Sequence, residues 1–214
     1  VVICASHLGR PKGKVVPEMS LEPVAKRLSE LTGKQVKFAK DCVGTEAKKV
    51  VDSAKSGDII LLENLRFHPE EEENDESFAK NLAELADCYV NDAFGSSHRA
   101  HASIVGITKF LQDKAAGFLI EKEVNALSKL LEKPERPFLL IIGGAKVADK
   151  IGMIKNLLDK VDTIITGGVM AYTFIRANNW ETGNSKVEAD AIPLAKEIYK
   201  ELRKRHLEFH TPLD

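Results

Sequence analysis

The run Asp58-Ile59-Ile60-Leu61-Leu62-Glu63 is the clearest β-strand in the sequence, and the polar loop Asn64-Leu65-Arg66-Phe67-His68 follows it directly. Short β-rich runs of this kind alternate with amphipathic segments along the chain, which is typical of βα units and a mainly parallel sheet. The pattern predicts seven strands: Val1–Ser6, Gln35–Ala39, Asp58–Glu63, Cys88–Asn91, Phe138–Ile142, Asp162–Thr166 and Leu207–His210.

Apolar residues at helical spacing predict helices between these strands. The strongest repeat comprises Leu21, Val24, Ala25, Leu28 and Leu31. Ser20 is a plausible N-cap for this helix and Gly33 its stop. Apolar stripes within residues 50–54 and 78–85 predict two further helices. The strongly acidic run Pro69–Glu76 has no such stripe, and we interpret it as a solvated surface loop.

A longer helix is predicted over Leu119–Lys133, because Ile120, Val124, Leu127 and Leu131 form a single stripe. Two prolines, Pro134 and Pro137, end this helix, and a new strand begins immediately afterwards. We interpret the segment as a connector between two domains.

The predicted architecture is α/β: two Rossmann-like three-layer domains with mainly parallel sheets, joined by an interdomain helix. The expected boundaries are 1–118, 119–135 for the helix, and 136–214. Strand-like sequence at both ends, and the small number of strands in the second part, lead us to expect a fragment in which both domains are incomplete.

Composition and charge narrow the possible functions. The chain has 214 residues, of which 43% are hydrophobic and 29% charged, as in an ordinary globular protein. A formal net charge of -1 provides no overall field for nucleic acid or anionic lipid. Cys4, Cys42 and Cys88 lack the spacing of a zinc site or a disulfide scaffold, and no apolar run approaches the roughly 18 residues of a membrane span. We therefore expect a cytoplasmic protein that binds neither nucleic acid nor membrane.

Basic side chains follow three predicted strands at their carboxyl ends, where ligands bind in open α/β sheets. These loops carry Arg10, Arg66 and Arg99, together with the histidines His7, His68, His98 and His101. Guanidinium groups match carboxylate and phosphate oxygens in a bidentate way, so a converging set predicts a site for a small, multiply charged anion. The alternative is a set of unrelated, solvated arginines. His98 and His101 have no carboxylate or cysteine nearby at ligand spacing, and we predict no metal ligand in this chain.

Two later strands run into paired glycines, Gly143-Gly144 and Gly167-Gly168. Such turns let a backbone approach a ligand closely, and a helix that starts there offers N–H groups to phosphate. Lys146 and Lys150 are four residues apart, so that in a helix they would share one face. Tight strand-to-helix turns with two solvated lysines are an equally good interpretation. The sequence has neither a Walker A loop nor a G-x-G-x-x-G fingerprint, which disfavours a dinucleotide-dependent dehydrogenase. The combination suits phosphoryl transfer across a cleft.

The motifs at these positions resemble those of the phosphoglycerate kinase family. The resemblance extends in order over essentially the whole chain, and its five motifs are 6–11 (SHLGRP), 62–68 (LENLRFH), 91–101 (NDAFGSSHRAH), 117–123 (GFLIEKE) and 143–151 (GGAKVADKI).

This resemblance implies a monomeric, cytosolic, hinge-bending glycolytic kinase that transfers a phosphoryl group between 1,3-bisphosphoglycerate and Mg-ADP, giving 3-phosphoglycerate and Mg-ATP. Residues 1–118 would bind the phosphoglycerate, 119–135 would form the hinge helix, and 136–214 would bind the nucleotide. The substrate-binding residues implied are His7, Arg10, Arg66 and Arg99. The nucleotide contacts implied are Gly143, Gly144, Lys146, Lys150, Gly167 and Gly168, with Lys150 also steadying the transferred phosphoryl group as the catalytic residue.

Some elements of the family are not found in this sequence. An opening strand with an Asp-Phe-Asn motif, a later arginine, the metal-holding carboxylate and a C-terminal glycine-rich turn are absent, and Val169 stands where the family often has a third glycine. We therefore expect little or no kinase activity from this chain alone. A catalytically inactive relative that acts as a binding module remains the alternative, as does a different α/β enzyme with an anionic substrate.

Overall fold

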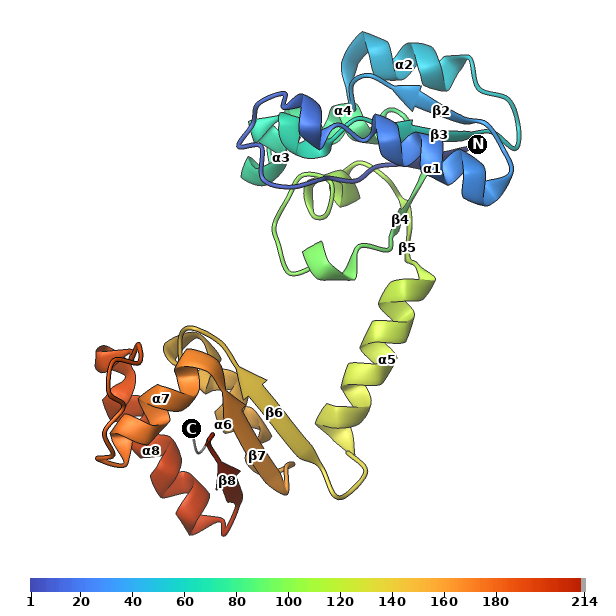
Figure 1. Cartoon of the computed structure of the whole chain (residues 1–214). Helices are drawn as coiled ribbons and strands as arrows, with labels where there is room; N and C mark the ends of the chain where they lie inside the picture. Colours follow the sequence, from blue (N-terminus) through green and yellow to red (C-terminus); the bar gives the residue numbers. More distant parts are fainter. Residues whose placement is uncertain (213–214) are drawn as a thin grey trace. The chain divides into compact units, whose positions relative to one another are not determined.

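The computed structural model describes residues 1–212, and the chain divides into two compact units, Val1–Glu123 and Val124–Asp214. Its strands are β1 (Val2–Cys4), β2 (Val36–Ala39), β3 (Ile59–Leu62), β4 (Cys88–Asn91), β5 (Asp113–Ala116), β6 (Leu139–Gly143), β7 (Thr163–Gly167) and β8 (Glu208–His210). Its α-helices are α1 (Glu22–Thr32), α2 (Gly44–Asp52), α3 (Pro69–Glu73), α4 (Glu76–Ala83), α5 (Phe118–Glu132), α6 (Ile151–Leu157), α7 (Gly168–Ala177) and α8 (Ile192–Lys204) (Figure 1).

The predicted fold class, α/β with parallel sheets, is confirmed. Every strand pairing among residues 1–212 is parallel, in sheets ordered β1-β3-β2, β4-β5 and β6-β7-β8. All seven predicted strands are present with ends shifted by at most two residues, and β5 is an additional strand that the sequence pattern did not predict.

The first unit places helices on both faces of its β1-β3-β2 sheet, because the chain reverses direction across the sheet between β2 and β3 and right-handed crossovers then fall on opposite sides. Leu61 and Val36 pack with Leu21 and Ala25 of the α1 region. On the other face, Ile60 and Leu62 pack in a core that also contains residues of α2 and α4. Figure 1 shows α1 and α2 on either side of the strands.

Helix α1 ends where the sequence predicts, at Gly33, which adopts the left-handed conformation with φ 65°. Its start differs slightly from the prediction. Leu21 occupies the N-cap position, while the Ser20 hydroxyl accepts a hydrogen bond from Glu22 N at 3.2 Å and donates one to Glu63 at 2.7 Å.

The interpretation of Pro69–Glu76 as a solvated loop is wrong. Residues 69–73 form helix α3, with Pro69 in its first turn, and Asp75 caps α4 by accepting a hydrogen bond from Phe78 N. Glu71 is only 3% exposed. A run of acidic residues therefore contains one side chain that is part of the buried structure.

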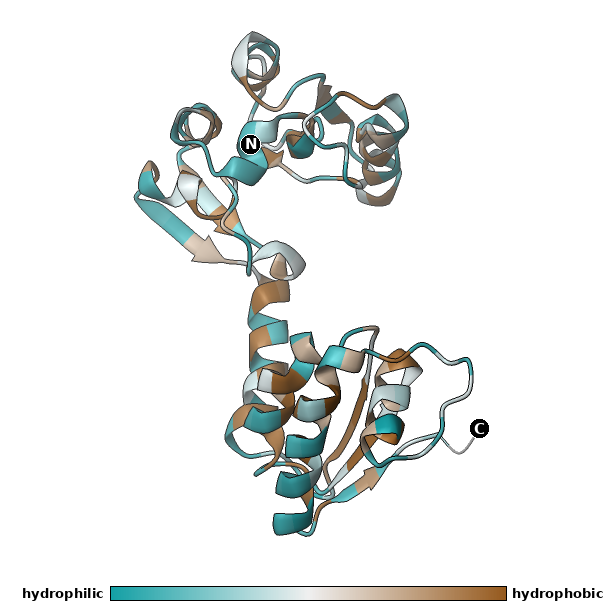
Figure 2. Ribbon diagram, turned by 90° about the vertical axis from the view of Figure 1, so that its left-hand side faces the viewer, coloured by the Kyte–Doolittle hydropathy of each residue, from teal (hydrophilic) through white to brown (hydrophobic). Residues whose placement is uncertain are grey.

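The second unit follows the simpler strand order β6-β7-β8, and successive right-handed crossovers place its helices on one face. Ile142 and Ile164 of the sheet share a core with Ile154 of α6, Phe174 of α7 and Ile198 of α8. Residues that point to the opposite face, among them Ile141 at 71% exposure, are accessible. Figure 2 shows apolar strands in this unit beside helices that combine apolar and polar segments.

None of the helices among residues 1–212 combines the length and the apolar character needed to cross a membrane.

The left-handed conformation of Gly33 gives a test of the fold. We expect Gly33→Ala to lower the free energy of unfolding of the first unit by about 1 kcal/mol, because a Cβ disfavours positive φ even where, as here, no atom obstructs it. Exchange of the β3 amides with deuterium in the whole chain measures this quantity. Gly95→Ala is the control, because Gly95 has no positive φ and equally open surroundings. Equal stability of the two variants would contradict this account of the helix end.

Candidate functional site

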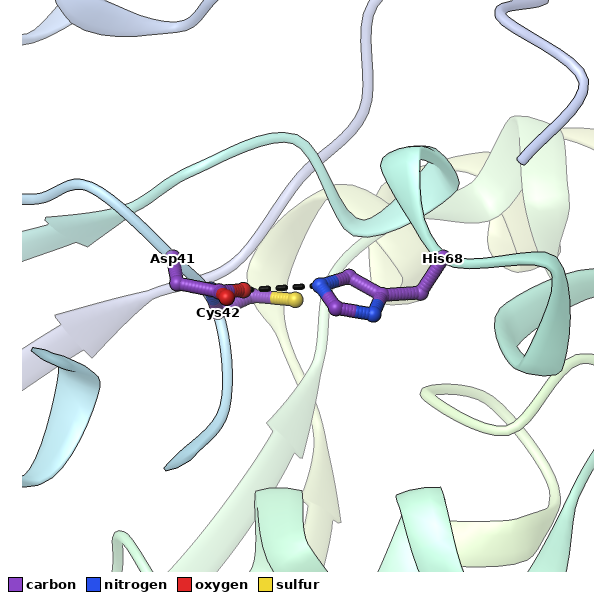
Figure 3. Close-up of side chains that lie close together, drawn as sticks. All are labelled: Asp41, Cys42 and His68. Atoms are coloured by element: carbon purple, nitrogen blue, oxygen red, sulfur yellow. Dashed lines mark hydrogen bonds and ion pairs between the residues drawn. The ribbon is translucent and has the colours of Figure 1, made fainter. Parts of the chain in front are cut away.

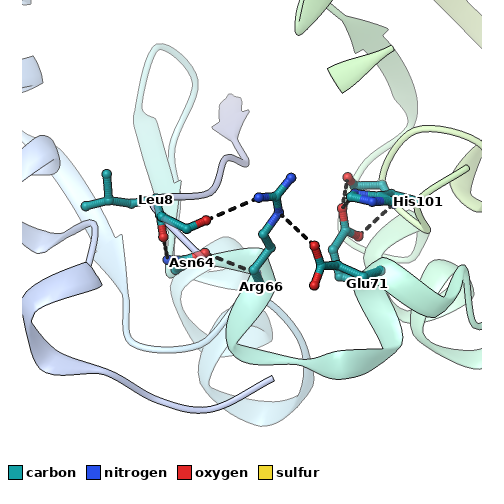
Figure 4. A network of polar contacts seen from close by, with 8 residues as sticks. Leu8, Asn64, Arg66, Glu71 and His101 are labelled. Atoms are coloured by element: carbon teal, nitrogen blue, oxygen red, sulfur yellow. Dashed lines mark hydrogen bonds and ion pairs between the residues drawn. The ribbon is translucent and has the colours of Figure 1, made fainter. Parts of the chain in front are cut away.

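The candidate site in the first unit is built around the loop that leaves β3. Leu65–Phe67 form one turn of 3-10 helix, and the Asn64 side chain caps this turn by accepting a hydrogen bond from Arg66 N at 3.0 Å. Asn64 is completely buried. Its Nδ2 donates to Leu8 O at 2.8 Å and to Met19 O at 2.9 Å. One amide therefore joins the β3 exit loop to the loop that follows β1 (Figure 4).

Further contacts hold the same two loops together. Leu65 N donates to Ser6 O at 3.1 Å, and Gly13 N donates to Arg66 O at 3.3 Å. Beside Asn64, the Glu63 carboxylate accepts hydrogen bonds from Leu21 N and from its neighbour Asn64 N, both at 2.8 Å. The position of the β1 loop relative to β3 is thus fixed by several hydrogen bonds.

Arg66 is the central cation of the site. Its side chain is 7% exposed, its Nη1 donates to Gly9 O at 3.2 Å, and its Nε lies 3.6 Å from Glu72 Oε1. That separation is too long for a hydrogen bond, so the buried Nε–H has no acceptor among the described residues. An unpaired buried donor is costly, and an anion that reached it would satisfy it.

The pKa of His7 is lowered by its surroundings, which include Arg66. Burial is the main cause that lowers its pKa, and interactions with Arg66, His101 and Arg99 lower it further, while Glu72 acts in the opposite direction. These interactions require the loops after β1, β3 and β4 to approach one another. The structure therefore brings His7, Arg66, Arg99 and His101 into one electropositive region, as the anion-site prediction requires.

Helix α3 anchors the third loop of this region. The Glu71 carboxylate accepts hydrogen bonds from Ser103 N at 2.9 Å and Ser103 Oγ at 2.5 Å, and its Oε1 lies 3.6 Å from Nδ1 of the buried His101. Glu71 O also accepts from Ala102 N at 2.9 Å. No sequence pattern indicates this role, because Glu71 is one of several adjacent acidic residues and its partners lie about thirty positions later.

Not all basic residues of these loops are buried or paired. Arg10 and Arg99 are exposed, and no side-chain hydrogen bond or ion pair among residues 1–212 involves either of them. His98 is also exposed. His68 does not join the basic group: its Nε2 lies 2.7 Å from Asp41 Oδ1, and its ring packs against Phe78 at 5.3 Å between centroids.

In the second unit, the two glycine turns lie side by side. Gly143 pairs with Gly167 at the ends of β6 and β7, and Met170 N of α7 donates to Gly144 O at 3.0 Å. A Cβ on Gly143 would lie 3.3 Å from Gly167 O, and Gly168 has φ 65°. The close approach of the two turns therefore requires glycine, and it leaves a backbone surface without side chains at this strand edge.

The expectation that Lys146 and Lys150 share a helical face is wrong. Lys146 lies in an irregular loop, Lys150 ends a short 3-10 turn (Ala148–Lys150), and α6 begins only at Ile151. Both lysines are exposed at the carboxyl end of β6. They are available to an anion, but on a loop rather than on a helix face. The glycine turns and these lysines fit a phosphate-bearing ligand such as a nucleotide.

The fold and these sites define an α/β protein with parallel sheets that carries cationic and glycine-lined strand ends, as anion- and nucleotide-binding proteins do. The sequence matches the family described as "Phosphoglycerate kinase" over residues 1–214. The chain belongs to the phosphoglycerate kinase family.

Known relatives agree with this assignment. The chain is 55% identical over 213 residues to the phosphoglycerate kinase of Pelotomaculum thermopropionicum and 54% identical to that of Chlorobium phaeobacteroides, in each case over 100% of this chain and 54% of the relative. The phosphoglycerate kinase structures from Coxiella burnetii and Pyrococcus horikoshii superpose with TM-scores of 0.81 and 0.83, at 38% and 32% identity, over 99% of this chain and 53% and 55% of theirs. The chain spans about half the length of the curated relatives it matches.

The role of Asn64 can be tested by its removal. Asn64→Ala leaves two carbonyl oxygens and one amide of a partly buried network without their partner, and we expect the first unit to lose about 1–3 kcal/mol of unfolding free energy. Exchange of the β1 and β3 amides measures the loss. Asn81→Ala, at an exposed position of α4, should change it by less than about 0.5 kcal/mol. A similar small change for both variants would show that Asn64 does not hold the loops.

The electrostatic arrangement predicts a shift at His7. Replacement of the Arg66 charge in Arg66→Gln should raise the pKa of His7 toward its ordinary value, because one of the nearby positive charges that lower it is removed. Titration of the His7 ring protons by NMR measures this pKa. Arg27→Gln removes an exposed arginine on α1 that pairs with Glu30 and should leave the His7 pKa unchanged. A fall in the pKa, or no change, would mean that Arg66 does not face His7.

Proposed function

We propose that the chain belongs to a phosphoglycerate kinase of glycolysis, with reversible phosphoryl transfer between 1,3-bisphosphoglycerate and ADP, giving 3-phosphoglycerate and ATP, and that the chain alone has little or no kinase activity. The observation that carries this proposal is the convergence of His7, Arg66, Arg99 and His101 from three strand ends, in a chain whose net charge is -1. Membership of the family supports the same reaction.

The phosphoglycerate would bind at this electropositive region. We assign the contacts to His7, Arg10, Arg66 and Arg99. The buried Arg66 offers a fixed donor, while the exposed Arg10 and Arg99 are free to turn toward a ligand. Guanidinium groups suit both the carboxylate and the phosphate of such a molecule, since each presents two oxygens to the planar fork.

The adenine nucleotide would bind at the glycine turns of the second unit. The proposed contacts are Gly143, Gly144, Lys146, Lys150, Gly167 and Gly168. The bare backbone of the glycine turns lets phosphate oxygens approach closely. We assign to Lys150 the further role of steadying the phosphoryl group in transit. Mg²⁺ bound with the nucleotide would neutralise phosphate charge.

The chemistry requires positioning more than covalent participation. A terminal oxygen of ADP attacks the phosphorus of the acyl phosphate, the bond from phosphorus to the carboxyl oxygen breaks, and 3-phosphoglycerate leaves as a carboxylate. No enzyme-bound intermediate is needed, so alignment and cationic stabilisation carry the rate enhancement. The arginines and lysines present in this chain supply charge of the required sign.

The remaining assignments are part of the same proposal. Residues 1–118 form the phosphoglycerate-binding domain, 119–135 the hinge helix, and 136–214 the nucleotide-binding part. The protein would act in the cytoplasm as a monomer that binds no nucleic acid and no membrane. An inactive relative would bind the same ligands as an active kinase. Binding is therefore the first step to test.

Titration of 3-phosphoglycerate into the whole chain by calorimetry at low salt tests the first site. We expect saturable heat. Arg66→Ala should weaken binding by about tenfold or more, because a charge-assisted hydrogen bond contributes about 1.5–3 kcal/mol.

Two controls complete this test. Arg27→Ala removes an exposed arginine elsewhere on the first unit and should bind as the original chain does. Arg66→Lys keeps the charge without the fork and should bind between the two. Absence of heat from the unaltered chain, or equal binding by Arg66→Ala, would overturn the anion site.

A further inference from the structure

A second group of chemically active side chains lies at the carboxyl edge of the first sheet, outside the electropositive region. Asp41 and Cys42 follow β2, and His68 follows the 3-10 turn after β3. A carboxylate oxygen, the thiol sulfur and a ring nitrogen all lie within 4.8 Å of one another. Figure 3 shows the imidazole and the carboxylate pointing toward each other with the sulfur beside them.

The three side chains are held in place by their surroundings. His68 Nε2 lies 2.7 Å from Asp41 Oδ1, and the same oxygen accepts a hydrogen bond from Cys42 N at 2.6 Å. The His68 ring packs against Phe78, while Cys42 is completely buried in the core of the unit. Asp41 and His68 are partly exposed. The group therefore has one possible metal ligand, the Cys42 sulfur, in the core, and two, from Asp41 and His68, that are partly exposed.

A cysteine nucleophile activated by His68 is a poor interpretation of this group. Burial is the main cause that raises the pKa of the Cys42 thiol far above its ordinary value, and the negative charge of Asp41 raises it further. A reactive cysteine needs the opposite environment, with positive charge nearby and access for a substrate.

We propose that Asp41, Cys42 and His68 form a binding site for a divalent transition metal of the Zn²⁺ type. Thiolate, imidazole and carboxylate together are donors that Zn²⁺ and Co²⁺ accept, whereas Mg²⁺ selects oxygen ligands. One thiolate and one carboxylate balance the two positive charges of the ion.

The geometry needs little adjustment. Metal–ligand bonds of about 2.0–2.3 Å place tetrahedral donors about 3.5 Å apart, and the three ligand atoms already lie within 4.8 Å of one another. The ion replaces the proton between His68 Nε2 and Asp41 Oδ1, which moves the ring to the tautomer protonated at Nδ1. It also replaces the thiol proton of Cys42, which leaves to solvent. Three protein ligands and partial exposure leave a fourth position for water.

Cobalt provides the test, because Co²⁺ substitutes for Zn²⁺ and absorbs light. Addition of Co²⁺ to the reduced whole chain should produce one equivalent of tetrahedral d–d absorption together with a sulfur-to-cobalt charge-transfer band, and Zn²⁺ should displace both. Cys42→Ser should abolish the charge-transfer band. The matched control is Cys88→Ser, which removes an exposed thiol and should leave the spectrum unchanged.

His68→Gln decides the matter independently, because His68 lies nearer the surface and its replacement does not alter the buried thiol. We expect it to weaken Co²⁺ binding by about tenfold or more, with the far-ultraviolet circular dichroism unchanged. No charge-transfer band in the original chain, a band lost in Cys88→Ser, or unchanged affinity in His68→Gln would each overturn the proposal.

Discussion

The arrangement of the first unit depends on the buried Asn64 side chain at the carboxyl end of β3. Its amide donates to two carbonyl groups, Leu8 O and Met19 O, and its oxygen accepts from Arg66 N. Backbone groups of loops normally find partners in water, but here the completely buried Asn64 side chain supplies them. This side chain, together with the backbone contacts between the two loops, therefore fixes how the β1 loop lies against the β3 exit loop.

Two acidic residues of α3 lie beside basic groups of the electropositive region, in a chain whose net charge is -1. Glu71 and Glu72 of α3 each lie 3.6 Å from a cationic or basic group, at His101 and Arg66 respectively. At these separations neither glutamate forms a direct hydrogen bond to its basic neighbour, Arg66 or His101. Burial has the largest effect on the pKa of His7 and lowers it; among the charged groups nearby, Arg66, His101 and Arg99 lower it further and Glu72 acts in the opposite direction.

The features that the sequence predicted correctly are those set by neighbouring residues, namely the strands and one helix end. Apolar runs marked all seven expected strands, and Gly33 marked the end of α1. Strand β5 was not predicted, because all four of its residues, Asp113–Ala116, are exposed and show no alternation of apolar and polar side chains. The burial of Glu71 depends on Ser103, thirty-two residues away, and the cluster around Cys42 depends on a histidine twenty-seven residues after Asp41. Lys146 was misplaced because the glycine turn delays the start of α6.

Both groups of polar side chains in the first unit follow from the position of β3 in the sheet order β1-β3-β2. A central strand has a neighbour on each side, so its exit loop passes between the exit loops of both. Arg66 turns toward the β1 loop and donates to Gly9 O, while His68, two residues later, turns toward the β2 loop and contacts Asp41. Because Arg66 and His68 point to opposite sides of one short loop, the electropositive region and the group of Asp41, Cys42 and His68 lie apart from each other. An edge strand, with one neighbour only, could not support both.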